Sequence, residues 1–419
     1  MAPDHLDGAG QSPPELSRRE FLAAGAAGVA AAALTAAGLS GAPRRAFAQG
    51  LPRVAWVQDD RAALGWSSDF SLRVDPAVAD EMMGRAVQLL TGEDTVAGAW
   101  GQIFRAHNGG ADYQPSQQIA IKVNFNNNSD VLQHNPSFQV LNALLRQLIE
   151  DVGIAPGDLI LYDSSRGFLR QFSDGVAARF PDVLNNPSNA TQYNQSVWNT
   201  RLTRLLEDAT YLINMPILRT HGAAGVSLSF KNHLGSVENP HALHVGLDGA
   251  TPEESSLVTL NRHDLIRNKT MLVVADGIYG LRVGGPDGNP GSTSNGILDP
   301  YPNSLFLARD PVAVDSVMID YLASRGAVFQ RFGNPYEPRR YLVAASSIGL
   351  GIHETSADFN YQSIELARCT NGECSGAILP PPGTPNPTEE PESDSTPIAG
   401  CFIPSTADGE QEIVICTTG

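Results

Sequence analysis

The stretch QIAIKVNF at residues 118–125 and the stretch LILY at residues 159–162 enclose a longer segment of different character, residues 136–152. The two outer stretches are short, apolar and rich in β-favouring residues, which is typical of buried strands. The middle segment ends before Gly153 and repeats its apolar residues at helical spacing, at Val140, Leu141, Leu144, Leu145 and Leu148. A strand, a helix and a second strand in this order predict two parallel strands with the helix packed on one face of the sheet.

The same alternation continues on both sides of this segment. Further strands are predicted at residues 54–57, 211–216, 271–275 and 304–308, and further helices at residues 75–90, 198–208 and 311–323. Residues 172–196, rich in Asn and Ser, are predicted to be a long loop. Strands that alternate with helices are typical of α/β proteins, so we predict an α/β fold over residues 49–366, with a mostly parallel sheet flanked by helices.

Residues 1–48 have the pattern of a twin-arginine export signal. Arg18 and Arg19 precede an Ala-rich apolar run at residues 23–41, and residues 46–48 (AFA) provide a small-x-small cleavage site. An uncleaved N-terminal helix is the alternative. The order of arginines, apolar run and cleavage site favours the signal. We therefore expect the twin-arginine translocase as a partner during export, and a mature chain that is periplasmic or extracellular.

Residues 367–419 are predicted to be a cysteine-bearing tail with a Pro-rich linker. Pro, Glu, Ser and Thr dominate from Gly376 onward, a composition that cannot bury a core and predicts a disordered Pro/Glu-rich tail. All four cysteines lie here, at Cys369, Cys374, Cys401 and Cys416. In an oxidising compartment the short spacings favour one disulfide within the first two and one within the last two. A four-thiolate metal site, the alternative, needs shorter paired spacings.

The charge of the chain disfavours several classes of partner. The sequence has 28 basic and 45 acidic residues and a formal net charge of −17. An acidic surface repels phosphate groups, so we expect neither nucleic acid nor an anionic membrane as a partner, although a local basic pocket for a small anion is compatible with this charge. No segment after the signal is apolar for long enough to cross a bilayer, so no membrane span is expected in the mature form.

Polar residues at the ends of the predicted strands are candidate site residues, because ligands of open parallel sheets bind beyond the carboxyl ends of the strands. Lys122, Asn124 and Asn126 share one face of their predicted strand, since alternate residues point the same way. A lysine in an apolar strand is costly to bury unless it meets an anion or a carboxylate. The alternative is an edge strand with its polar face in water. Residues 163–167 (DSSRG) fit either a ligand site or a turn.

The densest polar group follows the predicted strand at residues 211–216. Five of the nine histidines fall within about forty residues, at His221, His233, His241, His244 and His263. Imidazoles suit metal ligation, and the neighbouring cations Arg219 and Lys231 suit an anionic ligand. His221, His233 and His244 are the candidate metal ligands, although no His-Glu-x-x-His signature is present. The alternative for each histidine is a local hydrogen bond with no ligand.

Three aspartates are further candidates. Asp276 follows the predicted strand at residues 271–275 and precedes a glycine-rich stretch, residues 284–291, which lacks the lysine of a P-loop and the spacing of a dinucleotide fingerprint. We therefore predict neither ATP nor NAD. Asp310 is predicted to cap a helix that begins at Pro311. Asp315, one turn into that helix, has no such structural explanation. A Gly-x-Ser-x-Gly nucleophile motif is absent from the sequence.

In combination these residues resemble the DUF362 family, whose domains of unknown function occur in bacteria and archaea and often follow a twin-arginine signal. The resemblance rests on motifs in the family's order: Lys122-x-Asn124, Asn214-x-Pro216, Arg219-Thr220-His221, Lys231-Asn232-x-x-Gly235, Asp276-Gly277, Gly285-Pro286 and Asp310-Pro311-x-Ala313-x-Asp315. It implies an α/β core. Many members carry ferredoxin-type cysteines, but the predicted core has none, so an iron–sulfur cluster is not supported. Arg219 stands where the family usually has lysine, which keeps the charge and changes the donor geometry.

The sequence therefore predicts an exported enzyme that binds a small acidic ligand or a metal in a crevice lined by Lys, His and Asp. The predicted catalytic residues are Lys122, His221, Lys231 and Asp276. The predicted ligand-binding residues are Asn124, Arg219, Asn232 and Asp315. A divalent metal is a candidate cofactor. Two alternatives use the same crevice: a non-catalytic exported ligand-binding or surface protein, and a cofactor-handling protein.

Overall fold

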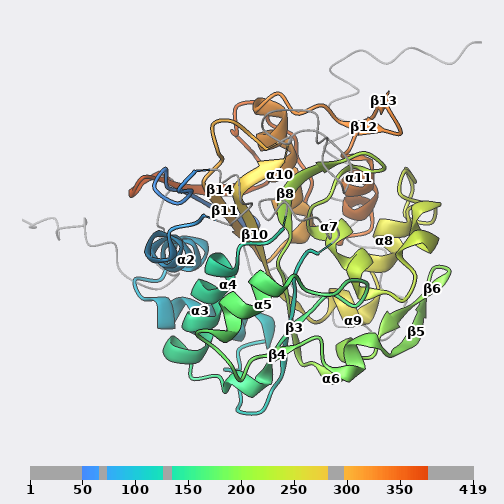
Figure 1. The fold of residues 1–419 in the computed structure, drawn as a ribbon. Coiled ribbons are helices and arrows are strands. Elements are labelled where there is room, and N and C mark those ends of the chain that lie inside the picture. Colours follow the sequence, from blue (N-terminus) through green and yellow to red (C-terminus); the bar gives the residue numbers. More distant parts are fainter. Residues whose placement is uncertain (1–49, 66–72, 126–134, 282–296, 376–419) are drawn as a thin grey trace, which may run out of the picture. The chain divides into compact units, whose positions relative to one another are not determined.

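The computed structural model describes residues 50–65, 73–125, 135–281 and 297–375. Its main sheet has 11 strands. They are β1 (Arg53–Gln58), β2 (Ile119–Lys122), β3 (Leu159–Tyr162), β4 (Leu184–Asn185), β7 (Tyr211–Asn214), β8 (Ile217–His221), β9 (Gly225–Val226), β10 (Thr270–Leu281), β11 (Ser304–Ala308), β14 (Glu365–Thr370) and β15 (Glu373–Ser375). The strand order is β15-β14-β1-β11-β10-β7-β2-β3-β4, with β8 pairing β10 and β9 off this path (Figure 1).

Most neighbouring strands of this sheet are parallel. Strands β4, β3, β2, β7 and β10 run in the same direction, and β14 is parallel to β1, whereas β11 is antiparallel to both β1 and β10. Strands β2 and β3 pair from Ile119 opposite Leu159 to Lys122 opposite Tyr162, as the strand–helix–strand pattern predicts. The predicted α/β fold with a mostly parallel sheet and flanking helices is confirmed.

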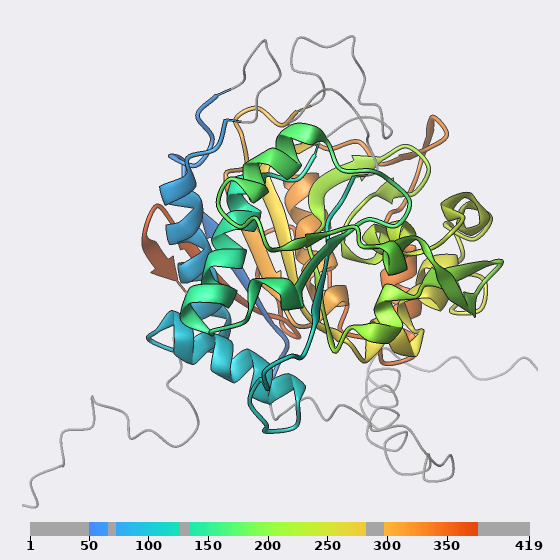
Figure 2. The same cartoon turned by 60° about the horizontal axis from the view of Figure 1, so that its bottom comes forward.

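Helices cover both faces of the sheet (Figures 1 and 2). The first face packs on α2 (Pro76–Thr91), α3 (Val96–His107), α4 (Phe138–Arg146) and α5 (Arg170–Ala177). The second face packs on α6 (Leu205–Asp208), α7 (Ser229–Asn232), α8 (Ser256–Asn261), α9 (Asp264–Arg267), α10 (Pro311–Ser324) and α11 (Arg340–Ser347). Along β2, Ile119 and Ile121 belong to the first apolar cluster and Ala120 to the second. This alternation places the side chain of Lys122 on the second face.

The start of α10 is the cap that the sequence predicts. Asp310 Oδ1 accepts hydrogen bonds from the amides of Val312 at 2.8 Å and Ala313 at 3.0 Å, and Pro311 is the first helical residue. The other oxygen of Asp310 accepts from the amide of Ile352 at 2.9 Å. The carboxylate therefore satisfies two free amides of the helix and also fixes a distant loop.

The predicted helix at residues 198–208 is wrong. Strands β5 (Tyr193–Val197) and β6 (Thr200–Thr203) form a hairpin there, and only α6 is helical. Trp198 has a φ of 52°, a left-handed conformation that suits the tight turn and breaks a helix, and the β-branched Thr200 and Thr203 favour a strand. The predicted loop at residues 172–196 also contains most of α5, the short strand β4 and part of β5.

Other predicted elements differ in length. Strand β2 is shorter than residues 118–125, and β10 extends well past residue 275. The helix predicted at residues 136–152 begins at Phe138 and continues after α4 as a π-helix, Gln147–Asp151. It ends before Gly153, whose φ is 84°.

The sheet also continues past the boundary predicted at residue 366. Strand β14 pairs with β1 in parallel and with β15 antiparallel, and Cys369 and Cys374, at paired positions, form the predicted local disulfide. Cys401, Cys416, the signal and the Pro-rich linker lie outside the described residues. Within the described ranges, no helix has the length and apolar character needed to span a membrane.

Candidate functional site

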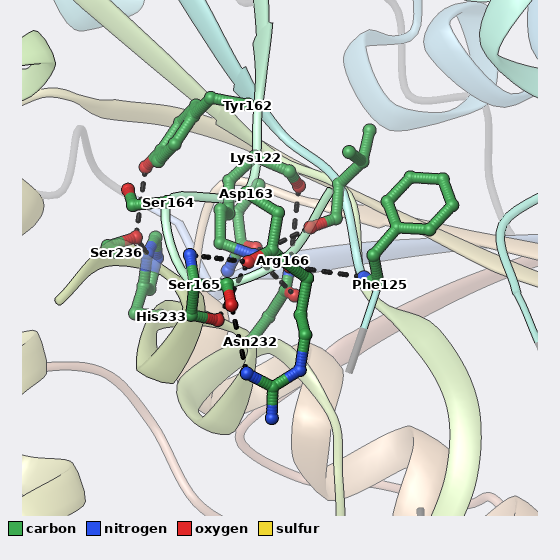
Figure 3. A network of polar contacts seen from close by, with 12 residues as sticks. Lys122, Phe125, Tyr162, Asp163, Ser164, Ser165, Arg166, Asn232, His233 and Ser236 are labelled. Atoms are coloured by element: carbon green, nitrogen blue, oxygen red, sulfur yellow. Dashed lines mark hydrogen bonds and ion pairs between the residues drawn. The ribbon is translucent and has the colours of Figure 1, made fainter. Parts of the chain in front are cut away.

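Lys122 is fully buried at the end of β2, between β7 and β3. Its Nζ donates to Val123 O at 2.6 Å, Asp163 Oδ2 at 3.1 Å and Asn232 Oδ1 at 3.3 Å (Figure 3). Each of its three N–H groups thus has an acceptor. The alternative interpretation, an edge strand with a polar face in water, is wrong because strands lie on both sides. Lys122, which the sequence predicts as a catalytic residue, uses its donors to join β2 to the turn after β3 and to α7.

Asp163 is the carboxylate that the buried lysine requires. Its Oδ2 also accepts from the amide of Phe125 at 3.1 Å, and its Oδ1 accepts from the amide of Ser165 at 3.1 Å and from Ser165 Oγ at 2.9 Å (Figure 3). The sequence alone left this segment open between a turn and a ligand site. Strand register is the signal that connects Asp163 with Lys122. Lys122 ends β2 opposite Tyr162, which ends β3, so the residue directly after β3, Asp163, lies beside Lys122.

Asn232 connects this ion pair to β7. Its side-chain amide donates to Lys122 O at 3.1 Å and to Asn214 Oδ1 at 2.7 Å, and Asn214 Nδ2 donates to Ser229 O at 2.9 Å. Asn232, predicted to bind ligand, therefore holds α7 against the sheet. Asn124, also predicted to bind ligand, is buried just beyond the end of β2.

Gly235 allows the chain to pass close to the buried ion pair. A Cβ atom at this position would lie 2.5 Å from Lys122 Nζ and 2.6 Å from Asp163 Oδ1. The carbonyl of Gly235 also accepts from the amide of Ser164 at 2.7 Å. Gly235 of the sequence motif therefore allows close packing over the ion pair.

Asp315 holds the start of α7. Its Oδ1 accepts from the amide of Ser229 at 2.8 Å, and its Oδ2 accepts from the amide of Phe230 at 3.2 Å and from Tyr341 Oη at 2.9 Å. Burial raises the pKa of Asp315 to about 6, against the lowering effect of these hydrogen bonds. This predicted ligand-binding residue thus positions the helix that carries Lys231, which is the structural explanation that the sequence lacked.

Lys231 differs from Lys122 in its partners. It is 4% exposed, and no described residue forms a hydrogen bond or an ion pair with its Nζ. Burial lowers the pKa of Lys231 to about 7, and the positive charges of Arg219 and Lys122 contribute to the lowering. A buried ammonium without a carboxylate is unfavourable, so this amine is substantially neutral near pH 7.

His221 and His244 are the imidazoles whose pKa values are lowered by the charge of Lys231. Burial is the main reason that the pKa of His221 lies well below its usual value. The charges of Lys231, Arg219 and His244 lower this pKa further. The amide of Ala223 donates to His221 Nδ1 at 3.0 Å, which leaves the proton on Nε2. His244 Nδ1 lies 3.0 Å from the carbonyl of Pro240 and is therefore the donor, which leaves Nε2 as an acceptor. We call Lys231, Arg219, His221 and His244 the cationic cluster.

His233 does not join this cluster. Its Nδ1 lies 3.4 Å from Ser236 Oγ, which lies 3.0 Å from Tyr162 Oη (Figure 3). Burial and the charge of Lys122 lower the pKa of His233 to about 3. Among the described residues no three His, Cys, Asp or Glu side chains are placed to hold a metal ion. The predicted ligand set of His221, His233 and His244 is therefore not assembled, because His233 turns toward Tyr162.

Asp276 lies on the other face of the sheet. Along β10, Leu272 and Val274 belong to the first apolar cluster, and Asp276 follows in the same alternation. Its Oδ2 accepts from the amide of Ser137 at 2.7 Å and its Oδ1 from the amide of Ile278 at 3.1 Å. Burial raises the pKa of Asp276 to about 6. Because Lys122 faces the second side, Asp276 does not form the predicted crevice with the lysines.

Comparison with protein families gives one match. Residues 119–320 match the model described as a domain of unknown function, DUF362. The match supports the resemblance to the DUF362 family that the sequence motifs indicate. The DUF362 segment runs from β2 to α10 and includes the whole cationic cluster, the Lys122–Asp163 pair, Asp276 and Asp315. No curated protein matches the chain.

Gly235→Ala is expected to destabilise the protein by about 2 kcal/mol, because the new methyl group must displace the buried ion pair. Gly157→Ala is the matched control, since a Cβ at Gly157 meets no atom within 4 Å. Urea unfolding of both variants measures the difference. Equal stabilities for the two variants would contradict the close packing at Gly235.

Lys231→Met is expected to stabilise the protein at about pH 6 by roughly 3 kcal/mol, because it removes an uncompensated buried charge. The pKa of Lys231 is about 7 in the folded state and about 10.4 in the unfolded state, so the unfolded state binds more protons between these values. The wild type therefore gains stability as the pH rises from about 7 to 10, and the advantage of the variant shrinks over that range. Urea unfolding across this pH range measures both effects.

Lys269→Met is the control for this experiment. Lys269 Nζ donates to three carbonyl oxygens, those of Leu206, Glu207 and Ala209. Its removal leaves these acceptors unpaired and is expected to destabilise the protein at about pH 6. A loss of stability of the same size in Lys231→Met would show that Lys231 has a counter-charge in the folded protein.

Proposed function

We propose that the protein is an exported enzyme that binds a small acidic ligand at the cationic cluster. One observation carries this proposal: Lys231 is buried beside other cations, and no described residue offers it an acidic partner. An anionic ligand would supply the missing counter-charge and would raise the pKa of Lys231, so binding and protonation would be coupled. The formal net charge of the chain is −17, so a group of four basic side chains at one place is unusual for it.

The imidazoles of the cluster support a catalytic role. His221 Nε2 carries a proton and is a hydrogen-bond donor, whereas His244 Nε2 is free of a proton and is an acceptor. A donor and an acceptor beside an anion-binding lysine are the groups needed to move a proton on a bound acid. A non-catalytic ligand-binding protein would use the same cluster without turnover, so product formation from the bound acid distinguishes the two.

Binding is tested by isothermal titration calorimetry of the mature protein with acetate, malonate, lactate and inorganic phosphate. We expect at least one of these anions to bind, and Lys231→Met to weaken that binding at least ten-fold, because a buried charge-assisted contact is lost. Arg170→Ala is the matched control. It also removes one positive charge, but the Arg170 side chain is 90% exposed and lies on α5.

Two results would contradict this proposal. If none of the anions binds, the cluster is not an anion site of this kind. If Lys231→Met and Arg170→Ala weaken binding equally, the effect comes from the total charge of the protein and not from the cluster.

Export is proposed from the sequence of residues 1–48 and is consistent with the Cys369–Cys374 disulfide, since such bonds persist in oxidising compartments. Replacing Arg18 and Arg19 by lysine keeps the charge and is expected to retain the protein in the cytoplasm. Cell fractionation measures the location, and peptide mapping without reductant measures the disulfide. We expect the Cys369–Cys374 linkage in the exported wild type and free thiols in the retained variant. An unchanged location would contradict the twin-arginine route.

A further inference from the structure

The chain contains three lysines, Lys122, Lys231 and Lys269. Lys122 Nζ donates to three oxygen atoms around the Asp163 ion pair. Lys269 Nζ also donates to three oxygen atoms, at 2.6, 3.0 and 2.6 Å from Leu206 O, Glu207 O and Ala209 O. In both cases the acceptors occupy the N–H groups of an ammonium ion. Lys231 has no such acceptor among the described residues, so its amine is available for chemistry in a way that the other two are not.

The charges around Lys231 favour its neutral form. Arg219 and Lys122 lower its pKa after the larger effect of burial, and His221 and His244 in turn respond to the charge of Lys231. None of the groups in this set is acidic. A desolvated lysine beside other cations is the arrangement that makes an amine a nucleophile at neutral pH, because only the unprotonated amine can attack.

The helix that carries Lys231 is fixed at both ends. Asp315 accepts from the amides of Ser229 and Phe230 at its start, and Asn232 is bound to β2 and β7 at its end. A nucleophile on a short helix held in this way is oriented before substrate binds, which lowers the entropic cost of a covalent step.

We propose that Lys231 forms an imine with the carbonyl carbon of a small oxo acid. This inference rests on the proposed function, because the carboxylate of the oxo acid would be the anion bound beside Arg219. Nζ adds to the carbonyl carbon as the carbon–oxygen π bond opens, and the proton that the amine loses passes through His244 Nε2 to the oxygen, which becomes the hydroxyl of a carbinolamine. The second N–H proton of the amine passes by the same route to this hydroxyl, which departs as water and leaves the neutral C=N bond. His221 Nε2–H donates a hydrogen bond to the carbonyl oxygen, and no oxidant or reductant is needed.

Reductive trapping tests the imine. The mature protein is incubated with pyruvate or glyoxylate and cyanoborohydride, and the modified peptides are identified by mass spectrometry. We expect the reduced adduct at Lys231 to form at least ten-fold faster than any adduct at Lys122 or Lys269, and the rate to rise from about pH 6 to about pH 8 as the amine loses its proton. Lys231→Arg keeps the positive charge but cannot form an imine, so its adduct is expected to be absent.

The controls separate this inference from the proposed function. Calorimetry with malonate, which has no ketone or aldehyde carbon, measures anion binding alone. Malonate binding without an adduct would overturn the imine and leave the binding proposal standing, whereas failure of both would overturn both. Equal labelling of the three lysines, or equally fast labelling by acetone, would also overturn the oxo-acid assignment. These comparisons use the wild type, so they decide the matter even if Lys231→Arg does not fold.

Discussion

The buried ion pair between Lys122 and Asp163 is the interaction on which the second face of the sheet depends. It joins the ends of two adjacent parallel strands, and Asn232 extends it to β7 and to α7. Burying two charges is costly unless each is fully hydrogen-bonded, and here both the ammonium and the carboxylate have several partners. The pair therefore requires a unique arrangement of β2, β3 and α7, and Gly235 is the residue that leaves room for it.

Two lysines close to this network differ in their hydrogen-bond partners. Lys122 has a carboxylate and two further oxygen atoms as acceptors, whereas Lys231, on the helix that this network holds, has no acceptor among the described residues. The same charge of Lys122 that is satisfied by Asp163 contributes to lowering the pKa of Lys231. A satisfied cation thus helps to keep its neighbour neutral, and the structural network and the candidate site are parts of one electrostatic arrangement.

The sequence was sufficient for the fold class because periodicity and composition report on burial, as in β3 and β11, whose bounds match the prediction. It failed at residues 198–208, where the left-handed conformation of Trp198 starts a hairpin, because local pattern does not report a turn of this kind. For the candidate site, it grouped Arg219, His221 and Lys231 from their proximity in sequence. It placed Asp276 on the same side of the sheet as the lysines, because the face on which a side chain lies depends on the register of the strands, which the sequence does not give. For the same reason it did not connect Asp163 with Lys122.

The neutral state of Lys231 has a consequence for how a ligand would be held. An anion that enters the cluster finds an amine with a pKa of about 7, so at neutral pH part of the protein must take up a proton before the full charge pair forms. A carbonyl compound needs the opposite form, the free amine. With a pKa of about 7, Lys231 is present at neutral pH both as the ammonium ion and as the free amine. A permanent acidic partner would keep it protonated and would prevent its reaction with a carbonyl compound. Its lack of a carboxylate among the described residues is thus what distinguishes Lys231 from a structural lysine such as Lys122.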